Sequence, residues 1–126
     1  MPHFEKAKEA HNKFNAKIRF YILIEMKRFF QITNALDECK SFISDYESQQ
    51  SIVWKYLYRV NTMLALIFQN LSSFEISITY LNAAKDLIDR NAPVKSKHHG
   101  IIQRITGFYL MKLYKKSKAE VHLRLA

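Results

Sequence analysis

Residues 73–90 read SFEISITYLNAAKDLIDR, and this stretch decides the fold class. Large apolar or small residues recur in it at steps of three and four, namely Phe74, Ile78, Leu81, Ala84, Leu87 and Ile88. This is the period of an amphipathic helix with one buried face. Ser72 or Ser73 can serve as the N-cap, and Pro93 disfavours helical geometry in the residue before it. The sequence therefore predicts a helix over residues 73–90.

The flanking segments also have helical patterns. Residues 51–71 are apolar on nearly all sides, which predicts a central helix that its neighbours cover. Upstream, we expect a long helix over 4–32, either continuous or broken near 12–15, and a shorter helix that begins at Thr33 and Asn34. Downstream, we expect a basic loop over 94–100 and two helices at 101–114 and 117–126. The prediction is thus an all-α fold of six helices in three antiparallel pairs.

Composition excludes other fold classes. The chain has 126 residues, which fit one domain. Two glycines and two prolines are too few for the turns of a β-rich fold or for glycine-lined phosphate loops. Nine Phe, seven Tyr and one Trp are more than a disordered segment carries. We therefore expect a single helical domain over 1–126, with hairpin units at about 4–48, 51–91 and 97–126.

Cysteine content and hydropathy bear on the compartment. The lone Cys39 cannot form an internal disulfide, and residues 1–6 lack the apolar core of a signal peptide. The longest strongly apolar runs, 20–24 and 63–68, are far shorter than the roughly 20 residues needed to span a bilayer. We expect an intracellular protein, cytoplasmic or nuclear, with no transmembrane segment.

The formal net charge of +9 is unevenly distributed. It amounts to +4 over residues 1–32, −2 over 33–90 and +7 over 91–126. Such a balance favours acidic partners, which include nucleic acid, anionic membranes and acidic proteins.

Equivalent positions recur every 42 residues. The series are Ala35, Ser77 and Ala119; Leu23, Ala65 and Gly107; Met26, Phe68 and Leu110; Cys39, Leu81 and Leu123; and Phe42, Ala84 and Ala126. A small residue at the closest approach, with a large one a turn away, is what stacked helical hairpins require. The spacing therefore predicts an internal repeat.

The stretches LALIF (64–68) and FEISITYLNAA (74–84) resemble a tetratricopeptide repeat. The positions of that pattern would fall on Leu64, Ala65, Phe68, Phe74, Ser77, Leu81 and Ala84. The chain departs from the family in its 42-residue period, in Ser77 where alanine is usual, and in the late Pro93. The resemblance implies a short α-solenoid of stacked antiparallel hairpins. The alternative is a closed helical bundle whose spacings match by chance.

The same resemblance implies a non-enzymatic scaffold or adaptor. In that family the first helix of each pair lines a concave surface that grips a segment of another protein. In this register the surface would be a partner-binding groove of Lys17, Phe20, Ile24, Arg28, Arg59, Thr62, Leu66, Asn70, Ile101, Arg104, Phe108 and Lys112. The mixture is apolar and basic, so we expect an acidic partner segment with apolar anchors.

An alternative function rests on the basic C-terminal third. A basic patch of Lys95, Lys97, Lys115, Lys116, Lys118 and Arg124 would bind nucleic acid or an anionic membrane. No zinc-finger or basic-zipper signature supports readout of base sequence.

No catalytic constellation emerges, and we expect neither a cofactor nor a metal site. His98 and His99 are interpreted as solvated loop residues, and Cys39 as a small buried hydrophobe. Asp37, Glu38, Asp86 and Asp89 lie on the polar faces of amphipathic helices. The short final helix at 117–126 would expose apolar residues, which favours a homo-oligomer or an obligate complex.

Overall fold

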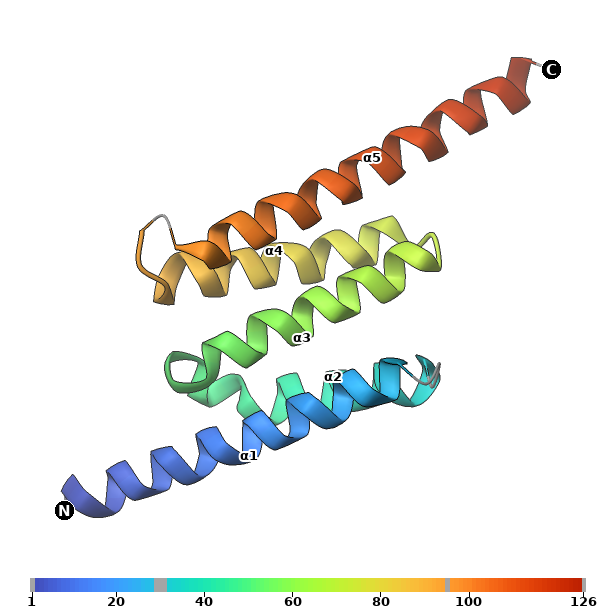
Figure 1. Cartoon of the computed structure of the whole chain (residues 1–126). Coiled ribbons are helices and arrows are strands. Elements are labelled where there is room, and N and C mark those ends of the chain that lie inside the picture. Colours follow the sequence, from blue (N-terminus) through green and yellow to red (C-terminus); the bar gives the residue numbers. More distant parts are fainter. Residues whose placement is uncertain (1, 29–31, 95, 126) are drawn as a thin grey trace.

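The protein is a stack of helices (Figure 1). The computed structural model describes the backbone of residues 2–28, 32–94 and 96–125, and the side chains of 6–25, 35–94 and 96–118. The helices are α1 (Pro2–Arg28), α2 (Ile32–Tyr46), the short 3-10 helix η1 (Glu47–Gln49), α3 (Gln50–Asn70), α4 (Phe74–Asn91) and α5 (Lys97–Leu125). No strand occurs in these ranges, which confirms the all-α prediction.

Helical hairpins follow one another along the stack. The α1 helix packs against α2, and α3 packs against α4 over its length. Adjacent hairpins meet where α3 contacts both α1 and α2 and where α4 contacts α5. Figure 1 places α1 and α5 at opposite edges of the molecule, with α3 and α4 between them. This packing is that of stacked antiparallel hairpins.

The central helix is α3, as the sequence predicts. Eleven of its residues are buried, and Val53, Val60 and Leu64 have no exposed surface. Its neighbours therefore cover it on most sides, and the main hydrophobic core is built around it. Apolar burial of this extent contributes most of the stability of a helical domain.

Small residues lie where α3 and α4 pack against each other. The Ser77 hydroxyl donates a hydrogen bond of 2.7 Å to the carbonyl of Ala65, and both residues are fully buried. One turn away, the rings of Phe68 and Tyr80 stack with centroids 5.8 Å apart. Small side chains at the crossing allow the two helices to approach closely.

The first two hairpins bury equivalent positions. Ala35 and Ser77, Cys39 and Leu81, and Phe42 and Ala84 are all buried, as are Leu23 and Ala65. Each pair is separated by 42 residues. The repeat expected from the sequence is therefore visible as a repeat of burial in residues 23–84.

The turn between α3 and α4 forms a Schellman motif. The Ser73 amide donates to the Phe68 carbonyl at 2.8 Å, and the Ser72 amide donates to the Gln69 carbonyl at 2.9 Å. Ser72 has a φ of 59°, in the left-handed region. Ser73 is the N-cap residue of α4, as predicted, but its side chain makes no capping hydrogen bond, so the backbone motif sets the turn.

We expect Ser72→Gly to stabilise the fold by about 0.5–1 kcal/mol, because glycine adopts positive φ without the steric cost that a side chain incurs. Urea denaturation measures the change in the free energy of unfolding. The control is Ser73→Gly, at a φ of −91°, which should give no gain. Equal effects of the two substitutions would contradict this account of the turn.

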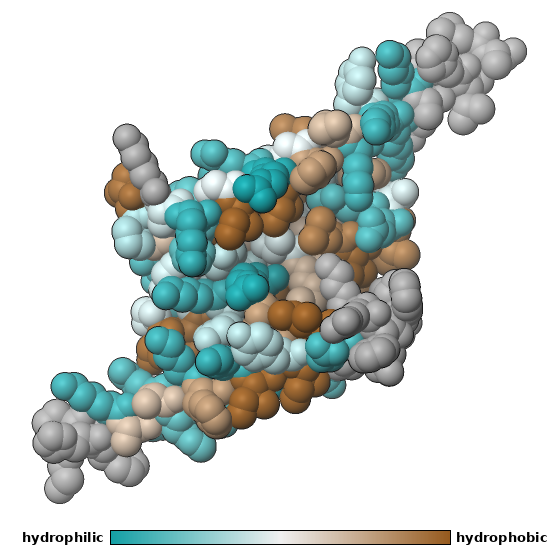
Figure 2. Space-filling view, in the orientation of Figure 1, coloured by the Kyte–Doolittle hydropathy of each residue, from teal (hydrophilic) through white to brown (hydrophobic). Residues whose placement is uncertain are grey.

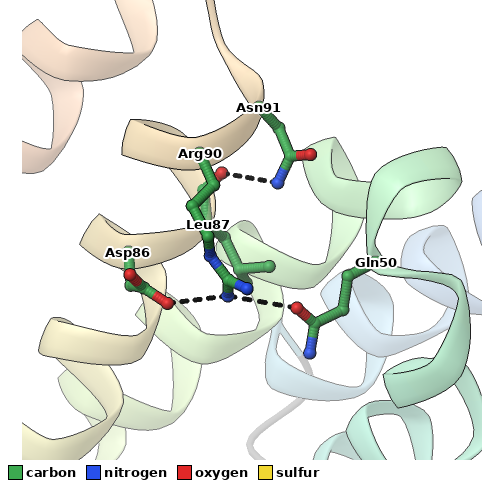
Figure 3. Close-up of polar contacts among 5 residues, drawn as sticks. All are labelled: Gln50, Asp86, Leu87, Arg90 and Asn91. Carbon is green, nitrogen blue, oxygen red and sulfur yellow. Dashed lines mark hydrogen bonds and ion pairs between the residues drawn. The ribbon is translucent and has the colours of Figure 1, made fainter.

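The opposite end of the hairpin is joined by Arg90 (Figure 3). Its guanidinium lies 2.6 Å from a carboxylate oxygen of Asp86 and donates to the side-chain oxygen of Gln50 at 3.1 Å. Nearby, the Asn91 side chain donates to the Leu87 carbonyl at 2.9 Å. Of these contacts, the hydrogen bond from Arg90 to Gln50 connects the end of α4 to the start of α3. The Arg90 and Asp86 side chains are exposed, so the pair adds little to stability.

The last part of the chain differs from the prediction. A single helix, α5, spans Lys97–Leu125, so the expected helices at 101–114 and 117–126 and the loop over 97–100 are wrong. Residues 115–118 (KKSK) contain neither glycine nor proline, and lysine is a good helix former. Nothing there stops the helix, so the hairpin predicted for the third unit is wrong, and Lys97–Leu125 form one helix. The α1 helix is likewise continuous across 12–15.

Candidate functional site

A groove of about 670 Å³ lies among α1, α3 and the first turns of α5. We call it the central groove. It is lined by Lys17, Phe20, Tyr21, Ile24, Lys55, Tyr56, Tyr58, Arg59, Thr62, Met63, Leu66, Lys97, His98, Ile101 and Ile105.

The stacking of the first helices positions these side chains. Lys17, Arg59 and Ile101 are separated by 42 residues and come from α1, α3 and α5. Phe20 and Thr62, and likewise Ile24 and Leu66, share this spacing. Because neighbouring repeats present equivalent faces, residues in the same register meet along one surface.

The central groove carries positive charge. Its lining includes Lys17, Lys55, Arg59 and Lys97, and none of the described residues lining it is acidic. The Arg59 guanidinium lies 4.5 Å from the ring centroid of Phe20, within the range of a cation–π contact. This contact joins α3 to α1 and holds the Arg59 charge at the groove.

The aromatic side chains of Tyr58 and His98 form one side of the central groove. The Tyr58 hydroxyl shares a 2.7 Å hydrogen bond with Nδ1 of His98. The Trp54 ring meets the His98 ring edge-on, with centroids 5.2 Å apart. These contacts join α3 to the first turn of α5.

Both groups of this hydrogen bond are neutral near pH 7. Burial lowers the pKa of His98 below its ordinary value, and the positive charges of Lys97, Lys55 and Arg59, with His99, lower it further. Burial raises the pKa of Tyr58, although Arg59 opposes the rise. The positive charges around His98 therefore disfavour its protonated, charged form.

Seven of the twelve predicted groove residues line the central groove: Lys17, Phe20, Ile24, Arg59, Thr62, Leu66 and Ile101. Asn70 and Lys112 lie farther along α3 and α5, where the ammonium of Lys112 donates to the Asn70 side-chain oxygen at 3.2 Å. Arg104 and Phe108 are exposed on α5 and are not part of the lining. The side chain of Arg28 lies outside the described residues.

The predicted basic patch is spread along α5. Lys97 lines the central groove, whereas Lys115, Lys116 and Lys118 are exposed on the distal part of the helix. The ammonium of Lys116 lies 5.1 Å from the Phe74 ring centroid. Lys95 and the side chain of Arg124 lie outside the described residues.

Sequence reasoning missed part of the lining, namely Tyr21, Lys55, Tyr56, Tyr58, Met63, His98 and Ile105. Each lies one, three or four residues from a predicted groove residue, so a wider helical face, with the last helix beginning at Lys97, would have included them. The interpretation of His98 and His99 as solvated loop residues is wrong. Both lie half-buried in the first turn of α5, and His99 Nδ1 lies 3.0 Å from the Ser96 hydroxyl.

The other candidate residues have ordinary surroundings. Cys39 is fully buried, with its Sγ 3.8 Å from the sulfur of Met63, which confirms that it belongs to the core. Asp37, Glu38, Asp86 and Asp89 are exposed, as predicted. Among the described residues, no group of three or more His, Cys, Asp or Glu could hold a metal ion. No helix in the described ranges has the length and hydropathy of a membrane span.

Comparison with known protein families, with curated proteins and with solved structures finds no match for this chain. The likeness of residues 64–84 to a tetratricopeptide repeat therefore stays a prediction from the sequence pattern.

Proposed function

We propose that the protein is a non-enzymatic interaction module whose central groove binds an acidic, apolar-anchored segment of a partner protein. One observation carries the proposal. Four cationic side chains surround a cavity whose remaining walls are mostly aromatic and aliphatic, and no acid lies among the described residues that line it.

The dimensions of the central groove indicate the kind of ligand. A cavity of about 670 Å³ accommodates a few side chains of a bound segment rather than a whole folded domain. Apolar anchors would pack on Ile24, Leu66 and Ile101, while carboxylates would face Lys55 and Arg59. Exposed ion pairs alone contribute little, so affinity would come from anchors and charges together.

A peptide titration tests this function. The probe is a fluorescein-labelled synthetic peptide that alternates glutamate with phenylalanine and leucine, and its control replaces each glutamate with lysine. We expect the full chain to bind the glutamate peptide at least about tenfold more tightly, because the four cations of the central groove attract only the acidic ligand. Fluorescence anisotropy measures both affinities. Equal binding of the two peptides would reject the proposal.

A second candidate function is nucleic-acid or anionic-membrane binding by α5. It is favoured by the run 96–118, which contains six lysine or arginine residues and no acid. Its affinity would fall steeply between about 50 and 200 mM salt, because bound phosphates release counterions. Retardation of RNA or binding of anionic vesicles, lost on changing Lys115, Lys116 and Lys118 to glutamate, would favour this function.

A further inference from the structure

One face of α5 is apolar and uncovered. It comprises Gly107, Leu110, Met111 and Tyr114, which lie close together because residues three, four and seven apart share a side of a helix. Leu110, Met111 and Tyr114 are 57%, 55% and 64% exposed. A Cβ built on Gly107 would meet nothing within 4 Å. We call this the outer face of α5. In Figure 2, brown and tan side chains lie among teal ones near the upper edge of the molecule, over α5.

The structure contains a covered counterpart of this face. Gly107 and Leu110 follow Ala65 and Phe68 by 42 residues. On α3, Ala65 and Phe68 are covered by α4. The Ser77 hydroxyl donates a hydrogen bond to the Ala65 carbonyl, and the Tyr80 ring stacks on the Phe68 ring. The outer face of α5 therefore corresponds to the surface on which a hairpin's second helix packs, and α5 continues straight instead of supplying that helix.

Helix charges indicate what would cover the outer face. The first helix of each hairpin is basic, at +4 for α1 and +2 for α3, whereas the second helices α2 and α4 carry −2 and −1. In the first hairpin, the Arg19 guanidinium meets the Asp45 carboxylate at 2.8 Å across the α1–α2 contact. The α5 helix holds seven basic residues and one acid, for +6. By the same complementarity, its second helix would be acidic.

We infer that the outer face of α5 docks an acidic amphipathic helix from a partner protein, which completes a third hairpin. The docked helix would place a small residue over Gly107 and a large apolar residue over Leu110, as α4 does on α3. Its carboxylates would face Arg104, Lys115 and Lys118, which are within three or four residues of the outer face. A second copy of this chain is a poorer occupant, because its own α5 carries the same +6 charge.

The probe for this inference is derived from α4. It is a labelled synthetic peptide of residues 74–91 with Lys85→Glu and Arg90→Glu, which leaves only acidic charges. Its control keeps Lys85 and Arg90 and changes Glu75, Asp86 and Asp89 to lysine. We expect the full chain to bind the acidic peptide at least about tenfold more tightly, since it matches both the register and the charge of the outer face.

Two matched variants locate the binding. Leu110→Glu places an acid on the outer face and should weaken binding of the acidic peptide at least about tenfold, by loss of apolar contact and by repulsion. Phe108→Glu makes the same charge change two residues away, on another side of α5, at a side chain that is 54% exposed. It should change the affinity less than about threefold. Both sites are exposed, and circular dichroism verifies folding of the two variants.

Three results would overturn the inference. The first is equal binding of the acidic and basic peptides. The second is equal loss in Leu110→Glu and Phe108→Glu, which would mean that only net charge matters. The third is a dimer of the wild-type chain, seen by light scattering, that Leu110→Glu dissociates, because a second copy would then occupy the outer face. The central groove is not involved, so Arg59→Glu should retain binding of the α4-derived peptide and lose only the groove ligand.

Discussion

Ser77→Leu is expected to destabilise the protein by about 3 kcal/mol. Ser77 has no exposed surface, and its hydroxyl bonds at 2.7 Å to the Ala65 carbonyl in the most closely packed pair of helices. A leucine would remove this hydrogen bond and force α3 and α4 apart. Overpacking of a well-filled core costs about 1–3 kcal/mol by itself.

The matched control is Ser77→Ala, which removes the hydroxyl without adding volume. Its cost should be about 1 kcal/mol, the net value of one hydrogen bond. Urea denaturation of both variants separates the two contributions. If leucine were tolerated as well as alanine, the small residue at this crossing would not be required for the close approach of α3 and α4.

Reversing two charges in the central groove should have the largest effect on binding. We expect the double variant Lys55→Glu with Arg59→Glu to weaken binding of the glutamate peptide at least about 100-fold, since each reversal replaces an attraction with a repulsion. Arg59 also loses its contact with the Phe20 ring, at 4.5 Å. Fluorescence anisotropy at two salt concentrations measures the loss, which should be smaller at high salt.

The control for this experiment changes Lys115 and Lys116 to glutamate. Net charge changes by the same amount, but the substitutions lie on the distal part of α5, away from the residues that line the central groove. Binding should weaken by less than about fivefold, through long-range electrostatics alone. A loss as large as that of the groove variant would show that overall charge, rather than the central groove, attracts the peptide.

The sequence predicted α3 and α4 within one residue at each end. Residues 73–90 combine a helical period with a nearby proline, and 51–71 are too apolar to be anything but central. The predicted break between two helices near residue 116 is wrong for a physical reason. A helix continues through Lys and Ser unless a glycine, a proline or packing stops it, and the 42-residue register suggested a turn that no local residue enforces.

The candidate site was predicted in part. Lys17, Phe20, Arg59 and Leu66 follow from stacking first helices in one register. His98 could not be found in that way, because its position depends on where α5 begins and on its hydrogen bond to Tyr58. Ser96, a residue type favoured at the N-cap, directly precedes α5, but the predicted start was four residues too late.

The attachment of α5 has a consequence for local stability. The helix contacts the stack mainly through α4, and the Tyr109 hydroxyl donates to the Phe74 carbonyl at 3.3 Å as one of its links. In a linear array each element is held by its neighbours, so a terminal helix that packs mainly on one neighbour opens at lower free energy than the middle. We therefore expect amide protons of α5 to exchange with solvent sooner than those of α3. Covering the outer face with a second neighbour would slow that exchange along the same helix.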